Sequence, residues 1–288
     1  MASLTEYCYV MSRKVVLILC SLLLWSSSGE AFFLTAIQEG EGYALKGEEV
    51  IWDLFRSEPF QGVIYDLKAP QALIYAPDKK PRLVALRRIK ILDHASGKKR
   101  FAWQAHFVPD TPGDYYLVLH SEPTLVSGLP EVWEEWVKVP LHVEQSKSWA
   151  RPLGLRVEIV PSVRPYGLMA GTSFSARVFF EGRPASRVRL QMVPFTGVYL
   201  TLKELPQDEN GRLDIPLMYL DLLTDEQGGF TVSFPHPGWW LLSAVIPIGQ
   251  YRLGQEQFPF YLRASLWLYL KPPFKVPETA PHIRPESN

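Results

Sequence analysis

Three side chains in the first half of this 288-residue chain are of the kinds that bind divalent metal ions: Glu58, His106 and His120. His106 and His120 occupy polar positions in two segments that we expect to be neighbouring strands, and Glu58 lies in a loop before them. Imidazole nitrogen suits borderline divalent metal ions. The three residues therefore predict a metal site, although an isolated strand histidine is more often an ordinary surface or core residue.

Catalytic chemistry has no comparable signal in the sequence. The chain contains no HExxH, no GxSxG, no glycine-rich phosphate loop and no closely spaced cysteine pair. Its histidines, at positions 94, 106, 120, 142, 236 and 282, are far apart, and none is at i, i+2 or i+4 spacing from another. We therefore expect a non-enzymatic protein, without catalytic or cofactor-binding residues.

The N-terminal residues have the pattern of a secretory signal. Arg13 and Lys14 precede an apolar run at residues 15–25, and small residues with a cleavage point after Ala31 follow. The run is about half of the ~20 residues that a membrane-spanning helix needs, so cleavage is favoured over a retained anchor. We expect residues 1–31 to be a signal peptide and the mature chain to be periplasmic or secreted.

Cys8 and Cys20 both precede the expected cleavage point, and the expected true start is Met11. The mature chain would then have no disulfide, and its stability would depend on burial of apolar side chains. Lys plus Arg and Asp plus Glu number 30 each, so the chain is neutral and shows no sign of nucleic-acid binding. We also expect no tight membrane insertion of the mature chain.

Alternation of apolar side chains with a period of two predicts an all-β fold. In RFAWQAHFVP, Phe101, Trp103, Ala105 and Phe107 share one face. We expect similar half-buried strands in both halves of the chain. The 25 prolines argue against long helices. The one short helix that we expect covers residues 129–136, with Pro130 in its first turn.

A polar, proline-containing break at residues 145–152 (QSKSWARP) separates two strand-rich halves. We expect two tandem β-sandwich domains, at residues 32–147 and 148–270, followed by a disordered tail at residues 271–288. In each half a Pro-Gly turn leads into an apolar strand, in TPGDYYLVL and in HPGWWLLSA, so that aromatic rings enter the space between two sheets.

A basic run at residues 79–100 contains nine Lys or Arg residues against a single acid, Asp93. Such a run can attract phosphate or anionic lipid headgroups. The favoured interpretation is a hairpin that turns at Ser96 and Gly97, with cations at its solvated tip. Lysines at a sheet edge also discourage aggregation between sheets.

The adjacent residues Trp239 and Trp240 suggest a further hypothesis, in which a sugar stacks on an exposed indole. In an alternating strand one of the two rings must face the core, and the other can pack on the neighbouring domain. Packing is favoured over sugar binding.

Short motifs occur in a characteristic order along the chain. The first half contains AFFLTAI, EPFQGVIYDLKAP, TPGDYYLVL and EEWVKVPLHV, and the second contains GLRVEIVP, RPYGLMAG, FFEGRPASRVRLQMV, TDEQGGF and GWW. In this order they resemble a family of periplasmic proteins of largely unknown function, which includes NikM-like accessory components of nickel or cobalt uptake. The resemblance covers most of the mature chain and implies an immunoglobulin-like or transthyretin-like sandwich without catalytic activity.

The chain departs from that family at the positions expected to hold metal. Many members begin the mature protein with a histidine and carry a GHPFE-like loop, whose imidazoles are natural nickel ligands. This chain has Phe32 near its mature start and reads RSEPFQ at residues 56–61. A metal role therefore cannot be transferred residue by residue, and Glu58, His106 and His120 remain as the candidate ligands.

Two functions from different classes stay open. The first is an exported accessory protein of transition-metal uptake, which binds nickel or cobalt or passes it to a metal-transporter membrane component. The second is a metal-free structural or interaction module that binds a protein or polysaccharide partner. The missing imidazoles favour the second function, and the long ordered resemblance favours the first.

Overall fold

The computed structural model describes residues 32–60, 62–77, 80–126, 129–196, 210 and 220–273. Within these ranges the chain forms strands β1 to β19 and no helix, so the predicted all-β fold is confirmed. No described segment forms a helix that is long and apolar enough to cross a membrane. The expected signal peptide and residues 274–288 of the expected tail lie outside the described residues.

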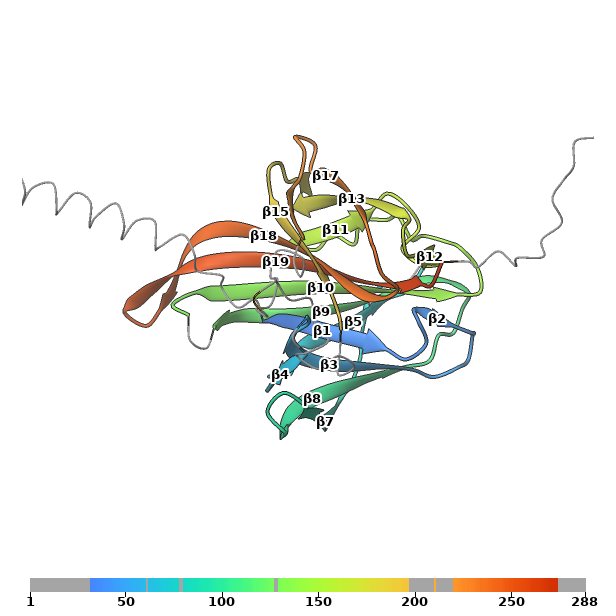
Figure 1. Cartoon of the computed structure of the whole chain (residues 1–288), viewed down its shortest axis with the longest axis horizontal. Helices are drawn as coiled ribbons and strands as arrows, with labels where there is room; N and C mark the ends of the chain where they lie inside the picture. Colours follow the sequence, from blue (N-terminus) through green and yellow to red (C-terminus); the bar gives the residue numbers. More distant parts are fainter. Residues whose placement is uncertain are drawn as a thin grey trace, which may run out of the picture. The chain divides into compact units, whose positions relative to one another are not determined.

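The largest sheet has ten strands and runs through both halves of the chain (Figure 1). Its order is β16-β15-β18-β19-β10-β9-β5-β6, with β12 beside β19 and β2 beside β10. The first half supplies β2 (Tyr43–Ala44), β5 (Gln71–Tyr75), β6 (Arg82–Leu83), β9 (Gly113–Leu125) and β10 (Val132–Val143). The second half supplies β12 (Leu168–Met169), β15 (Arg189–Pro194), β16 (Leu220–Leu223), β18 (Gly238–Leu253) and β19 (Glu256–Lys271). The halves join where β10 pairs in parallel with β19, beginning with Val132 opposite Phe260.

Two smaller sheets lie on opposite faces of the ten-stranded sheet. The five-stranded sheet has the order β1 (Phe33–Gln38), β3 (Val50–Glu58), β8 (Lys98–Phe107), β7 (Leu86–Asp93), with β4 (Val63–Tyr65) beside β3. The four-stranded sheet contains β11 (Val157–Pro161), β13 (Ser173–Phe180), β14 (Arg183–Pro184) and β17 (Gly229–Ser233). Neighbouring residues of β19 point to the two small sheets. The indole N–H of Trp267 donates to the Leu34 carbonyl in β1 of the five-stranded sheet. Leu266, on the opposite face, packs in the core shared with β11, β13 and β17 of the four-stranded sheet.

The middle strands of the ten-stranded sheet are buried on both faces. The expectation of a half-buried strand is wrong for β10, since one small sheet covers each side. Much of β18 and β19 is likewise buried on both faces. Trp239 and Trp240 illustrate this, because they are only 8% and 3% exposed. The Trp240 ring lies 5.5 Å from that of Phe234, and the Trp239 ring lies 5.5 Å from that of Tyr269. The prediction of a core indole is confirmed, and neither ring presents an open face to a sugar.

The helix expected at residues 129–136 is wrong. Leu129 and Pro130 lie in the connection between β9 and β10, and β10 begins at Val132. The side chains from Val132 onward include β-branched and aromatic types that suit a pleated sheet. Ladders to β9 on one side and β19 on the other satisfy the backbone of this segment. Pairing with distant strands therefore outweighs the local signal of a proline in a first helical turn.

The break predicted at residues 145–152 falls in the connection between β10 and β11. The strands on its two sides nevertheless share the ten-stranded sheet through β10 and β19. Whether residues 32–147 and 148–270 fold as separate domains stays a prediction.

The basic hairpin is confirmed by β7 and β8. Asp93 pairs with Lys98 at its end, and Gly97 in the turn has a φ of +68°, which glycine adopts without strain. The Asp93 carboxylate is fully buried and accepts hydrogen bonds from the Ser96 hydroxyl and the Ile64 amide. The turn is thus fastened to β4 by a carboxylate from within the hairpin.

Candidate functional site

The three candidate metal ligands have separate surroundings. Glu58 is buried at the end of β3, His106 in β8 lies 3.0 Å from Glu49, and His120 in β9 lies 3.1 Å from Glu134. β8 belongs to the five-stranded sheet and β9 to the ten-stranded sheet, so the two histidines are not on adjacent strands as expected. Among the residues that the structure describes, no group of three or more His, Cys, Asp or Glu side chains could hold a metal ion. The assignment of nickel or cobalt to these residues stays a prediction.

His120 belongs to a network of partners around one carboxylate. The His120 ring stacks on the Trp136 ring, with 3.8 Å between their centroids. His120 Nε2 and the indole N–H of Trp136 both hydrogen-bond to Oε1 of Glu134. The second carboxylate oxygen of Glu134 accepts a hydrogen bond from Arg156 at 2.7 Å. Burial alone would raise the pKa of Glu134, but hydrogen bonds from His120 and Trp136 and the charge of Arg156 lower it overall. Glu134 is thus kept ionised, with His120 Nε2 already engaged.

A buried charge cluster lies beside Phe32, next to the start of β1. The Glu135 carboxylate lies 2.5 Å from Arg56 and 3.0 Å from Arg263, and both guanidinium groups also donate to the carbonyl of Phe32. We call Arg56, Glu135 and Arg263 the Glu135 cluster. Glu135 is 1% exposed. Burial raises its pKa, yet the two arginines outweigh burial and hold the pKa below its usual value.

Aromatic rings enclose the Arg263 side of this cluster. The guanidinium carbon of Arg263 lies 4.1 Å from the centroid of Trp133 and 4.6 Å from that of Phe33. Trp133 in turn stacks on Tyr261 at 4.8 Å. The faces of aromatic rings attract a cation, and more strongly when the cation is desolvated. The cluster therefore fastens the start of β1 to the middle of the ten-stranded sheet.

A second buried ion pair lies where the two halves of the chain meet. Lys138 of β10 donates to Glu158 of β11 at 3.0 Å and to the Ile159 carbonyl, and Glu158 also accepts from the amides of Leu153 and Gly154. Both side chains of the pair are almost completely buried. Burial lowers the pKa of Lys138, and the neighbouring Glu158 opposes that change. The pair holds the connection between the halves against the sheet.

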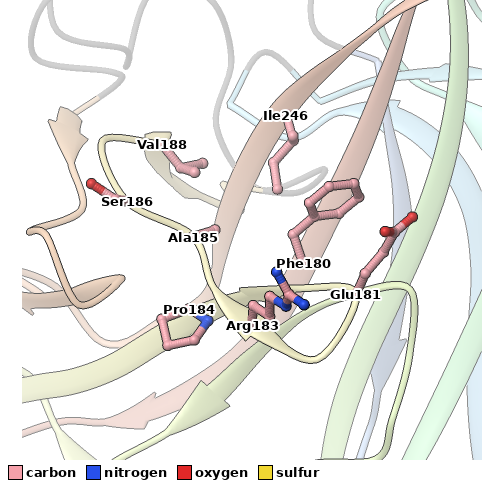
Figure 2. A pocket seen from close by; sticks show the side chains of 8 residues that line it. All are labelled: Phe180, Glu181, Arg183, Pro184, Ala185, Ser186, Val188 and Ile246. Carbon is pink, nitrogen blue, oxygen red and sulfur yellow. The ribbon is translucent and has the colours of Figure 1, made fainter.

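A cavity of about 630 Å³ opens beside β14 and β18 (Figure 2). It is lined by Phe180, Glu181, Arg183, Pro184, Ala185, Ser186, Val188 and Ile246. Three of its apolar members, Ala185, Val188 and Ile246, are each only 9% exposed. Free energy of apolar binding scales with the area removed from water, so these residues offer a ligand little affinity. The cavity is a weaker candidate than the charged surface of the basic hairpin.

The hairpin of β7 and β8 presents exposed positive charge. Its exposed cationic side chains, which we call the hairpin cations, are Arg87, Arg88, Lys90, Lys98 and Lys99. None of them has an ion pair in the described parts of the chain, whereas Arg100 lies 3.6 Å from the buried Asp93. The guanidinium carbon of Arg88 lies 3.8 Å above the Phe101 ring. Because the whole chain is neutral, this hairpin concentrates uncompensated charge in one element.

Sequence reasoning missed the Glu135 cluster and the Lys138–Glu158 pair, although a signal for the first was present. In the strand pattern EEWVKVPLHV, Glu135 has the same parity as the apolar residues Val137 and Val139, so alternation places all three on one face. A carboxylate on a core face needs a cationic partner. The parity therefore indicated a buried ion pair, without showing which arginines complete it.

Comparison with known proteins identifies a family and distant structural likenesses. Residues 37–247 match the family model described as Domain of unknown function (DUF4198). Alpha-2-macroglobulin of Salmonella, reacted with methylamine, is 17% identical over 83% of this chain and 14% of its own length, with a TM-score of 0.25. A DUF4785 family protein from Legionella pneumophila is 13% identical over 74% of this chain and 52% of its own length, with a TM-score of 0.28.

The trypsin-activated alpha-2-macroglobulin from Escherichia coli is 16% identical over 84% of this chain, with a TM-score of 0.26. This chain spans only 14% of the Salmonella protein and 16% of the Escherichia coli protein. No curated protein matches the sequence. The match to the family model agrees with the resemblance to proteins of largely unknown function that the motif order indicated, and it covers most of the chain. This protein belongs to the DUF4198 family.

Proposed function

We propose that this protein is an exported, non-enzymatic interaction module whose basic hairpin binds an anionic partner. The observation that supports this function is the set of hairpin cations, which are exposed and have no ion pair within the described residues. Concentrated positive charge steers an anionic partner to the surface and speeds association. The signal-peptide pattern at residues 1–31 supports export.

The hairpin is a rigid platform for such binding. The Phe101 amide donates to Asp66 at 2.7 Å, and Trp103 donates its indole N–H to the Leu67 carbonyl at 2.9 Å. At its other end, the turn is fixed by the buried Asp93. Charges on a rigid element lose little conformational entropy when a partner binds.

Charge reversal in the hairpin is expected to weaken binding of a model polyanion. A variant with Arg88→Glu, Lys90→Glu and Lys98→Glu should lose at least about tenfold in affinity for heparin at low salt. Each exposed ion pair between a hairpin cation and heparin contributes roughly 0.2–1 kcal/mol, and a glutamate in its place adds repulsion. Isothermal titration calorimetry at two salt concentrations measures this change.

The matched control carries the same change in net charge on the other half of the chain. It replaces three exposed arginines by glutamate, at Arg177, Arg183 and Arg252. Loss of affinity equal to that of the hairpin variant would show that only the total charge matters, and the hairpin would not be the binding element.

The resemblance to accessory proteins of nickel and cobalt uptake supports a second proposal. Here the partner is a metal-transporter membrane component, and the chain binds nickel or cobalt through Glu58, His106 and His120. Motif order over most of the mature chain favours this function. The separation of the candidate ligands disfavours it, because His106 and His120 lie in different sheets and the described residues contain no group of three or more His, Cys, Asp or Glu side chains that could hold a metal ion.

Metal titration separates the two proposals. If the protein is a metal-free module, chelator-stripped protein from Phe32 onward should give flat calorimetric titrations with nickel, cobalt and zinc. A stoichiometric site of micromolar or tighter affinity would instead support the metal role. His106→Ala and His120→Ala should then abolish the site, while the exposed control His94→Ala should leave it unchanged.

A further inference from the structure

We infer, building on the proposed function, that the outer edge of β7 accepts an extended acidic segment of a partner protein as an added strand. This binding mode combines main-chain hydrogen bonds to a sheet edge with side-chain contacts at alternate positions. It specifies both the class of the anionic partner and the part of the hairpin that it contacts.

The first support is the position of β7 at the edge of its sheet, as far as the structure describes the chain. β7 is the last strand in the order β1-β3-β8-β7 and pairs only with β8 among the described strands. It is eight residues long, and every residue except Asp93 is exposed or half-buried. An edge of this length presents a row of unpaired N–H and C=O groups to another chain.

The second support is the distribution of cations over both faces of β7. Arg87 shares one face with Ile89 and Ile91, and Arg88 shares the other with Lys90. A flat lipid surface meets one face of a sheet at a time. An added strand directs alternate side chains to both faces, so adjacent carboxylates can meet Arg87 and Arg88 together. The arrangement favours an extended peptide over a membrane surface.

The third support is the sign of the charge, which disfavours pairing with a second copy of this chain. Two β7 edges in antiparallel register would place like charges opposite one another, which destabilises a sheet. An acidic strand makes the same hydrogen bonds and replaces repulsion by attraction.

The geometry specifies a sequence pattern for the partner. Its acidic residues should face Arg87, Arg88 and Lys90, which means two adjacent carboxylates and a third two residues away. β-branched residues suit the remaining positions of a strand. The probe is therefore an eight-residue peptide with three glutamates in this pattern and threonine or valine elsewhere.

The decisive control is a peptide with the same charges and three prolines at non-acidic positions. Proline lacks the N–H that a sheet ladder needs, so the control keeps the electrostatic attraction but cannot form the strand. We expect it to bind at least tenfold more weakly than the probe. We also expect the probe to slow amide hydrogen exchange in β7, which the control should not do.

A charge swap tests the register of the added strand. Lys90→Glu should weaken probe binding by about twofold to fivefold, and a peptide with lysine at the position facing residue 90 should recover the lost affinity. Lysine at either of the other two acidic positions should not recover it. Equal recovery by lysine at all three acidic positions would show that binding has no fixed register and would overturn the inference.

The outcomes also separate this inference from the proposed function. Equal binding of the probe and its proline control, with heparin still bound, would overturn strand addition and leave a charge-based anion site. Binding of anionic phosphatidylglycerol vesicles without binding of the probe would do the same. Failure of peptides, heparin and vesicles alike would overturn both.

Discussion

Replacement of Glu135 by alanine is expected to lower the free energy of unfolding by about 3–5 kcal/mol, because it leaves buried cationic groups without their carboxylate. Glu135 is fully buried and bonds Arg56 and Arg263, and Arg263 is itself only 4% exposed. Both arginines would keep the Phe32 carbonyl as an acceptor, but a carbonyl does not neutralise two charges. Urea denaturation followed by tryptophan fluorescence measures the change.

Two further variants test the cause of this loss. Glu122→Ala removes an exposed carboxylate from the neighbouring strand β9 and should change stability by less than about 0.5 kcal/mol. The combined change Arg56→Met, Glu135→Leu and Arg263→Met should restore stability to near that of the unmodified chain or above, because apolar residues can replace a buried ion group without cost. A loss below about 1 kcal/mol in Glu135→Ala would contradict the role assigned to the cluster.

The Glu135 contribution should also depend on pH. The pKa of Glu135 is lower in the folded chain than its usual value, so the unfolded chain takes up a proton first as the pH falls. The contribution is complete above the unfolded pKa of about 4.3 and is lost as the pH falls through the lower folded pKa. The stability difference between the unmodified chain and Glu135→Ala should therefore shrink below about pH 4. A difference that stays constant down to pH 2 would show that the ionised carboxylate is not what stabilises the fold.

The sequence predicted the strands well because period-two alternation is a local property. It predicted the hairpin of β7 and β8 for the same reason, since Gly97 marks the turn between two adjacent strands. It could not predict the shared sheet, because β10 and β19 are far apart in sequence. Glu135 and Arg263, for example, are 128 residues apart and yet 3.0 Å from each other. Alternation within one strand contains no information about such a partner.

The candidate metal site shows the same limit from the functional side. Residue types alone indicated that Glu58, His106 and His120 could bind metal, but the grouping of ligands depends on which sheet holds each strand. β8 and β9 follow one another in the chain and were expected to be neighbours. A turn into a different sheet separates them, so that His106 pairs with Glu49 and His120 with Glu134.

The second large effect is expected at the joint between the two halves, where Glu158→Ala should lower the free energy of unfolding by about 3–5 kcal/mol. The change leaves the Lys138 ammonium buried, where it keeps its hydrogen bond to the Ile159 carbonyl and its contact with the Tyr116 ring but has no carboxylate partner. It also removes the acceptor of two amides in the connection. Glu181→Ala, at an exposed carboxylate of the same half, is the control and should change stability by less than about 0.5 kcal/mol.

A double-mutant cycle with Lys138→Met isolates the contribution of the pair. Lys138→Met alone leaves a buried carboxylate that still accepts two amide hydrogen bonds, so its cost should be smaller than that of Glu158→Ala. The double variant should be more stable than Glu158→Ala alone, because it no longer buries an unpaired charge. If the two single losses simply add, Lys138 and Glu158 act independently. The ion pair would then not be what holds the connection against the ten-stranded sheet.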